Sequence, residues 1–203
     1  MRTPILVALL VTGCMTPTAQ VPDLASSRVV ADFDTYRLRR VGLLPFTGDD
    51  LTGEEARHLQ ASFFTEASAV APFEIVPLDT SDVAEIPASD PFRRGVYKPR
   101  TIIDVARRFH LDAVMVGTVT DRRLFSPPRI GLQLDMVVSE TGMVIWNSTV
   151  HLDGAQQRVR NNIKLWASIG QGDLEEVDWK LCLLSPRRFA QFATYHLAQQ
   201  IAE

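Results

Sequence analysis

Residues 129–152 read RIGLQLDMVVSETGMVIWNSTVHL, and this stretch decides the fold. Apolar and polar residues alternate on both sides of residues 139–142, which have the composition of a turn. The inward positions are Ile130, Leu132, Leu134, Met136 and Val138 before the turn, and Val144, Trp146, Ser148, Val150 and Leu152 after it. Successive side chains of a strand point to opposite faces. The pattern therefore predicts an antiparallel hairpin with one buried face and one face in water.

Three further stretches on the amino-terminal side predict strands. Residues 39–46, RRVGLLPF, and residues 113–120, AVMVGTVT, contain apolar runs typical of buried strands. Residues 73–78, FEIVPL, predict another strand. Since proline cannot donate a ladder hydrogen bond, Pro77 places that strand at a sheet edge or its own end.

Three helix starts have recognisable chemistry. Thr52 to Glu55 form a capping-box pattern, Pro99 suits the first turn of a second helix, and Ser185 with Pro186 suits the start of the last one. Each start precedes an apolar stripe at helical spacing. The stripes are Ala56, Leu59, Phe63, Ala67 and Val70; Ile102, Val105, Ala106 and Phe109; and Phe189, Phe192, Ala193, Leu197 and Ile201. The weakly periodic residues 153–184 predict one helix and a loop.

These elements predict an α/β (α+β) fold: a mixed sheet of about five strands with an antiparallel hairpin, flanked by helices. We expect a single α/β domain over residues 38–203. Residues 14–37 contain prolines and serines without periodicity, which is typical of a tether. Residues 1–13 are expected to form a signal peptide.

The amino terminus reads MRTPILVALLVTGC: one positive charge, a short apolar run, small residues and a cysteine. That layout is typical of a signal peptide, and the run is far shorter than the roughly 20 residues of a membrane-spanning helix. Residues 10–14, LVTGC, resemble the lipobox of bacterial lipoproteins. The resemblance implies that Cys14 receives a diacylglyceryl thioether and becomes the new amino terminus, and two or three acyl chains anchor a protein stably.

An ordinary secretory signal cleaved a few residues later, for example near Ala19, is the alternative. The residue after the cysteine is Met15. In enterobacteria-like sorting, lipoproteins that are retained in the inner membrane have aspartate at that position. Resemblance to known lipoproteins thus implies an outer-membrane lipoprotein facing the periplasm, with the inner membrane as the other destination.

The net charge and the cysteine content of the chain limit which partners and which covalent links we expect. The formal net charge is -3, without the basic excess that drives nucleic-acid binding, so we expect no nucleic-acid partner. If Cys14 is acylated, Cys182 has no intramolecular partner, and no disulfide framework exists. The fold must then depend on core packing.

Motifs for catalysis, cofactor binding and metal binding are absent from the sequence. We therefore expect no catalytic, cofactor-binding or metal-binding residues, and we expect that the protein is not an enzyme. Surface or cap roles account for the histidines, and helix starts or solvated loops account for the paired acids. The histidines are His58, His110, His151 and His196, and the acidic pairs are Asp49–Asp50, Glu54–Glu55 and Glu175–Glu176. Five arginine pairs suit element ends or contacts with anionic lipid or glycan. They are Arg39–Arg40, Arg93–Arg94, Arg107–Arg108, Arg122–Arg123 and Arg187–Arg188.

Residues 40–46, RVGLLPF, residues 112–121, DAVMVGTVTD, and residues 140–146, ETGMVIW, resemble a group of bacterial envelope lipoproteins. Members share a fold with the amino-terminal domain of the TolB translocation protein, and they include the penicillin-binding-protein activator and the curli-secretion lipoprotein. The predicted order of strands and helices matches this group. Each stretch is also explicable as structure, for example through close packing at Gly42 and Gly117, so the resemblance supports fold more than activity.

The resemblance and the lipobox imply a non-catalytic interaction or assembly factor of a cell-envelope machine. Its expected partners are the membrane, through lipid on Cys14, and an envelope protein or a second copy. A subunit of an outer-membrane secretion pore and an envelope enzyme with dispersed active-site residues stay as alternatives. Residues 79–98 and 125–129 are the loops where we first expect a partner surface.

Overall fold

A computed structural model describes residues 21–84, 86, 98–170 and 178–201. The expected signal peptide, Cys14, Arg93–Arg94, Glu175–Glu176 and most of the 79–98 loop lie outside these residues. Within them, no helix is both long and apolar enough to cross a membrane.

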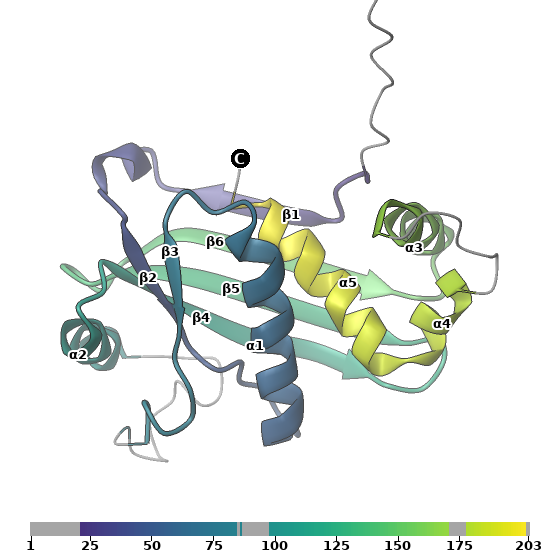
Figure 1. Ribbon diagram of the computed structural model, residues 1–203, viewed down its shortest axis with the longest axis horizontal. Helices are drawn as coiled ribbons and strands as arrows, with labels where there is room; N and C mark the ends of the chain where they lie inside the picture. Colours follow the sequence, from purple (N-terminus) through teal and green to yellow (C-terminus); the bar gives the residue numbers. More distant parts are fainter. Residues whose placement is uncertain (1–20, 85, 87–97, 171–177, 202–203) are drawn as a thin grey trace, which may run out of the picture.

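The chain forms one six-stranded mixed sheet, in the order β1-β6-β5-β4-β2-β3 (Figure 1). Its strands are β1 (Ala25–Val29), β2 (Arg40–Leu43), β3 (Glu74–Pro77), β4 (Ala113–Arg123), β5 (Arg129–Val138) and β6 (Val144–Asp153). β2 lies parallel to β3 and β4, whereas the β4–β5, β5–β6 and β6–β1 pairs are antiparallel. Pro77 ends the edge strand β3, as its chemistry predicts. The predicted mixed fold is confirmed, with one strand more than expected.

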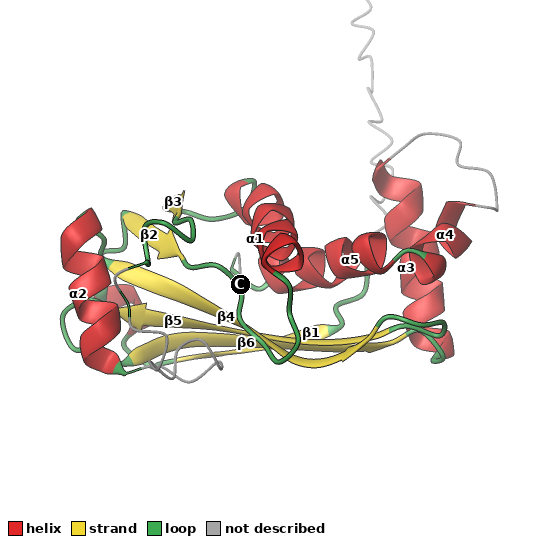
Figure 2. Cartoon of the chain, turned by 90° about the horizontal axis from the view of Figure 1, so that it is seen from below, coloured by secondary structure: helices red, strands yellow, loops and turns green. Residues whose placement is uncertain are grey.

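Helices cover the sheet unevenly. Helices α1 (Gly53–Ser68) and α5 (Pro186–Gln199) lie side by side on one face (Figure 2). Helix α2 (Pro99–Phe109) packs on the other face at one end, where Ile102 and Val105 join a second apolar cluster with Val114 and Val116. Helices α3 (Gln157–Gly170) and α4 (Asp178–Leu184) close the opposite end. The prediction of one helix and a loop in this region was therefore wrong. The structure has two helices, and the second is too short for its period to be recognised in the sequence.

The hairpin is confirmed, with Ile130 opposite Leu152 and Met136 opposite Trp146. A bulge between Met136 and Val137 shifts the register near the turn. The extra residue is Ile145 of β6, so the side chains between the bulge and the turn point to the opposite face from the predicted one. Ile145 is consequently buried and Val144 is exposed, the reverse of the predicted alternation at these two positions.

The wet face of the hairpin is polar, as predicted. Asp135 accepts hydrogen bonds from the side-chain amides of Gln133 and Asn147, which stand beside it. Thr149 is exposed on the same face and shares a hydrogen bond with Ser26 of β1, 3.2 Å away. This open face points away from α1 and α5 (Figure 2).

The main core lies between the sheet and the α1–α5 pair. Phe63 of α1 is fully buried there, together with Phe189 and Phe192 of α5. The close packing expected of two glycines is confirmed. A Cβ on Gly117 would lie 2.7 Å from ring carbons of Phe46, and one on Gly42 would lie 2.5 Å from Leu111 Cδ1.

The expected tether is partly folded. Residues 25–29 form β1, which pairs with β6 from Ala25 opposite Val150 to Val29 opposite Trp146. A 3-10 helix, η1 (Phe33–Thr35), follows, and Phe33 packs against the main core. The chain thus joins the sheet from Ala25 onward, whereas the domain was predicted to begin at residue 38. A short, mostly exposed edge strand needs no apolar alternation, so the pattern of residues 24–37 did not reveal it.

Candidate functional site

The amino-terminal ends of α1 and α5 lie near the ends of β4 and β5 that are joined by the β4–β5 loop (Figure 1). Residues from these four elements line an apolar pocket. Its volume is about 270 Å³. Buried apolar side chains form the floor, namely Leu59, Ile130, Phe189 and Ala190, while charged residues line the rim, namely Glu54, Glu55, Arg122, Arg123, Arg129 and Arg187. We call this the α1–α5 pocket.

Local sequence chemistry starts both helices at the pocket. The Thr52 hydroxyl accepts a hydrogen bond from the Glu55 amide, and Glu55 Oε2 accepts one from the Thr52 amide at 2.9 Å, which completes the predicted capping box. At the other helix, Ser185 Oγ accepts from the Arg188 amide, and Pro186 takes the first helical position. The rim therefore belongs to two well-defined helix ends.

Glu55 is held as a carboxylate. Burial raises its pKa, but the hydrogen bonds from the hydroxyl and amide of Thr52, together with Arg122, outweigh this effect and lower the pKa to about 2. Arg122 Nη1 lies 2.8 Å from Glu55 Oε2, and Arg122 Nη2 donates to the Asp50 carbonyl. The charges of this acid and this arginine thus satisfy each other.

His58 connects the two helices across the rim. Arg187 Nε donates to His58 Nδ1 at 3.1 Å, so Nδ1 carries no proton in this arrangement. The ring proton is then on Nε2, which donates to the Arg187 carbonyl at 3.3 Å. Both ring nitrogens are occupied in positioning α1 against α5.

The remaining arginines of the rim are also paired. Arg129 Nη2 donates to Asp153 Oδ2 at 3.2 Å, and Arg123 Nη2 lies 3.9 Å from the other oxygen of that carboxylate. A hydrogen bond from the Ala155 amide, with smaller contributions from Arg129 and Arg123, lowers the pKa of Asp153 against the opposing effect of burial. With three of its arginines engaged by the protein's own acids and Arg187 by His58, the pocket offers a binding partner mainly its apolar floor.

The size of the pocket also limits what it binds. Sites for small molecules usually enclose about 300–1,000 Å³, and a cavity of about 270 Å³ lies just below this range, with room for one large side chain. Apolar anchor residues that enter such pockets dominate the energy of many protein interfaces. The geometry suits an apolar side chain presented by another protein.

Several residues singled out from the sequence meet here. Glu54–Glu55, His58, Arg122–Arg123, Arg187 and the end of the 125–129 loop border the pocket, although they come from distant parts of the chain. Others lie elsewhere: His110 ends α2 in a left-handed conformation, and Arg40 pairs with Glu74 at 3.0 Å. His151 lies on the open sheet face, 3.6 Å from Asp121. Among the described residues, no three His, Cys, Asp or Glu side chains are grouped to hold a metal ion.

His196 differs from its prediction. It was expected at the surface, but it is 1% exposed, packed against the ring of Phe192 in α5. Its Nδ1 lies 3.8 Å from Asp23, which also accepts a hydrogen bond from Gln200. Burial lowers the pKa of His196 to about 4, although the Asp23 carboxylate acts in the opposite direction. Its spacing of four residues from Phe192, a member of the apolar stripe of this helix, is the sequence signal that could have indicated burial.

We expect the free energy of unfolding to fall by about 2–3 kcal/mol between pH 7 and pH 4.5 because of His196. In the unfolded chain this histidine binds a proton near pH 6.5, whereas in the folded protein it does so only near pH 4. The unfolded state therefore binds more protons in this window, and stability decreases as the pH decreases. Urea unfolding at several pH values measures the slope. His196→Leu should flatten it, and an unchanged slope in that variant would contradict the assignment.

Comparisons with known proteins give structural likenesses only. No protein-family model matches the chain, and no curated protein sequence matches it either. The PelC dodecamer from Paraburkholderia phytofirmans shows 14% identity over 71% of this chain and 94% of its own, with a TM-score of 0.44. Lipoprotein GNA1162 from Neisseria meningitidis shows 16% identity over 67% of this chain and 99% of its own, with a TM-score of 0.44. The LpoB carboxy-terminal domain from Salmonella enterica shows 11% identity over 57% of this chain and 82% of its own, with a TM-score of 0.38.

A lipoprotein is thus among the similar structures, in keeping with the coarser part of the expected resemblance. At these TM-scores, the likenesses carry no argument about activity, partner or assembly.

Proposed function

We propose that this chain is a lipoprotein anchored in the outer membrane through Cys14 and facing the periplasm. In this proposal it works without catalysis, as an interaction or assembly factor of the cell envelope. The α1–α5 pocket receives an apolar side chain of an envelope protein or of a second copy. The observation that carries the docking role is a pocket with an apolar floor and a charged rim whose arginines are paired within the protein.

The anchor is supported by the amino-terminal sequence. A positive residue, the apolar run of residues 5–11 and the LVTGC stretch occur in the order that lipoprotein processing requires. Seven peptide steps separate Cys14 from Val21, where the described chain begins, and they span at most about 25 Å. A lipid on Cys14 would therefore hold the folded domain close to the bilayer surface.

The docking role is supported by energetics. Binding an anion at the rim would require Arg122, Arg129 or Arg187 to leave the carboxylates or the histidine that they now contact. Covering the apolar floor breaks none of these contacts and removes apolar surface from water, at about 25 cal/mol per Å². An apolar side chain is consequently the favoured occupant.

We expect a photo-crosslinking amino acid at Glu54, exposed on the rim, to form one defined protein adduct in living cells. The same residue at Thr149, on the open sheet face, is the matched control and should form none. Ala190→Leu should abolish the Glu54 adduct, because the larger side chain fills the pocket from its floor. Thermal unfolding of the purified variant checks that the fold is kept.

Denaturing electrophoresis and mass spectrometry then identify the partner, which for self-association is this chain. Docking at the pocket would be refuted by the absence of an adduct from Glu54. It would equally be refuted by an adduct that persists in a folded Ala190→Leu protein.

A further inference from the structure

Exposed apolar side chains gather at the end of the molecule formed by α3, α4 and the β4–β5 loop. Phe125, in that loop, is 85% exposed. Leu184 of α4 is 67% exposed and Ile169 of α3 is 53% exposed, and Leu181 and Leu165 of the same helices are also exposed. We call these five residues the apolar end.

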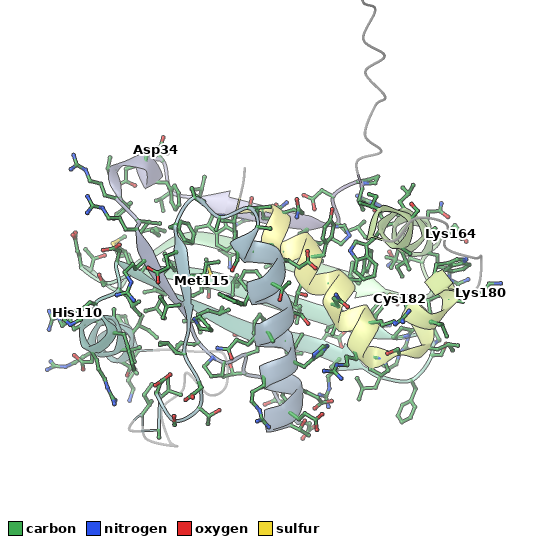
Figure 3. All side chains as sticks on the ribbon, in the orientation of Figure 1. Asp34, His110, Met115, Lys164, Lys180 and Cys182 are labelled. Carbon is green, nitrogen blue, oxygen red and sulfur yellow. The ribbon has the colours of Figure 1, made fainter. Side chains whose placement is uncertain are left out.

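The three segments of the apolar end are held side by side. The Gly154 amide donates to the Pro128 carbonyl at 2.8 Å, and a Cβ on Gly154 would lie 3.1 Å from Leu183 of α4. This ties the β4–β5 loop to α4. Lys164 of α3 places its Nζ 4.6 Å from the ring centroid of Trp179 in α4. Figure 3 shows Lys164 and Lys180 at this end, far from His110 at the other.

The chain that leads to Cys14 leaves the domain at the same end. Arg158 of α3 donates from Nη2 to the Asp23 carbonyl at 3.0 Å, just before β1 begins. Figure 1 shows the described chain starting beside α3. Since at most about 25 Å of chain separates Val21 from Cys14, a lipid anchor would bring this end toward the bilayer before any other.

The chemistry of the apolar end suits a lipid interface. Exposed leucine, isoleucine and phenylalanine side chains gain from entering the acyl boundary. Lysine stems lie along apolar surface while their ammonium groups stay in water. Lys164 of α3 and Lys180 of α4 supply such side chains at this end (Figure 3). Insertion of this kind depends on apolar area, so neutral lipids suffice.

We propose that the apolar end is a second membrane contact, which inserts into the interface of the bilayer that holds the Cys14 lipid. This inference rests on the proposed anchoring at Cys14. The lipid then supplies attachment, and the apolar end fixes orientation. The β5–β6 turn, at the opposite end of the sheet, points away from the membrane.

A fluorescent probe tests the contact in the full-length, lipidated protein. An environment-sensitive dye is attached to Leu184→Cys or Phe125→Cys, and the protein is reconstituted in phosphatidylcholine vesicles. Native Cys182 does not compete for the dye, because burial raises the pKa of its thiol to about 12. Met143→Cys, in the β5–β6 turn, is the matched control, since Met143 is an exposed apolar residue too, at 58%.

Lipids with brominated acyl chains should quench the dye at residues 184 and 125 by at least about twofold, and leave the dye at residue 143 unchanged. Equal signals at all three positions, in protein that floats with the vesicles, would overturn the membrane contact. Shielding of residues 184 and 125 that depends on protein density and not on brominated lipid would also overturn it, in favour of a second copy. Protein that fails to float at all would overturn the anchoring instead.

Discussion

Cys14→Ala is expected to release the protein from the membrane fraction almost completely. Without its thiol, residue 14 accepts no diacylglyceryl group, and the apolar run of residues 5–11 is too short to span a bilayer. The apolar end contributes only a reversible interfacial contact, which is weaker than two or three acyl chains. Fractionation of cell envelopes, followed by immunoblotting, measures the change.

The control for this variant is Cys182→Ala, which removes the other cysteine. Cys182 is buried beside α5 and is a free thiol, so its loss should leave the protein in the membrane fraction. The lipid anchor would be disproved by a Cys14→Ala protein that stays in membranes after its leader has been removed.

Gln60→Met is expected to lower the free energy of unfolding by about 1–3 kcal/mol. Gln60 is buried on the core side of α1, and its Nε2 donates to the carbonyls of Leu43 and Leu78 at 2.8 and 2.7 Å. The Leu43 carbonyl ends β2 and also accepts from the Leu78 amide at 2.9 Å, whereas the Leu78 carbonyl lies just after β3. Methionine fills a similar volume but donates nothing, so the Leu78 carbonyl loses its donor, and an unsatisfied buried carbonyl costs about 1–3 kcal/mol.

Urea unfolding monitored by circular dichroism measures this loss. Thr65→Leu is the comparison, because Thr65 is exposed on the same helix and its hydroxyl donates only to the Ala61 carbonyl of its own helix. Changes at such positions usually stay within about 0.5 kcal/mol. Gln60→Met and Thr65→Leu proteins of equal stability would contradict the role of Gln60.

Local patterns explain which elements were predictable. The hairpin followed from alternation, α1 from the capping box at Thr52 and Glu55, and the start of α5 from Ser185 and Pro186. Each pattern depends on residues close together in the chain. Gln60 was not recognised, because its partners are backbone carbonyls of strands whose position only the folded sheet defines.

Other elements carried no such pattern. Strand β1 is a short edge strand with a mostly exposed sequence, and it exists because β6 offers it an unpaired edge. The short α4 has too few turns for a period to be detected. Both are stabilised by tertiary contacts rather than by local preference.

The candidate site shows the same limit. Glu55, Arg122 and His58 were each noted as charged or titratable residues of the sequence, yet nothing in their spacing joins them. Their contacts connect distant positions, as between His58 and Arg187. The pocket is therefore a property of how α1, α5 and the β4–β5 end pack, although its individual side chains were visible from the start.

Mass spectrometry of the amino-terminal peptide, taken from protein extracted from membranes, tests the proposed function most directly. We expect a mature chain that begins at Cys14 and carries two or three acyl chains on that residue. A mature chain that begins later, for example after Ala19, and carries no lipid would contradict the proposal that this domain is held at a membrane by Cys14.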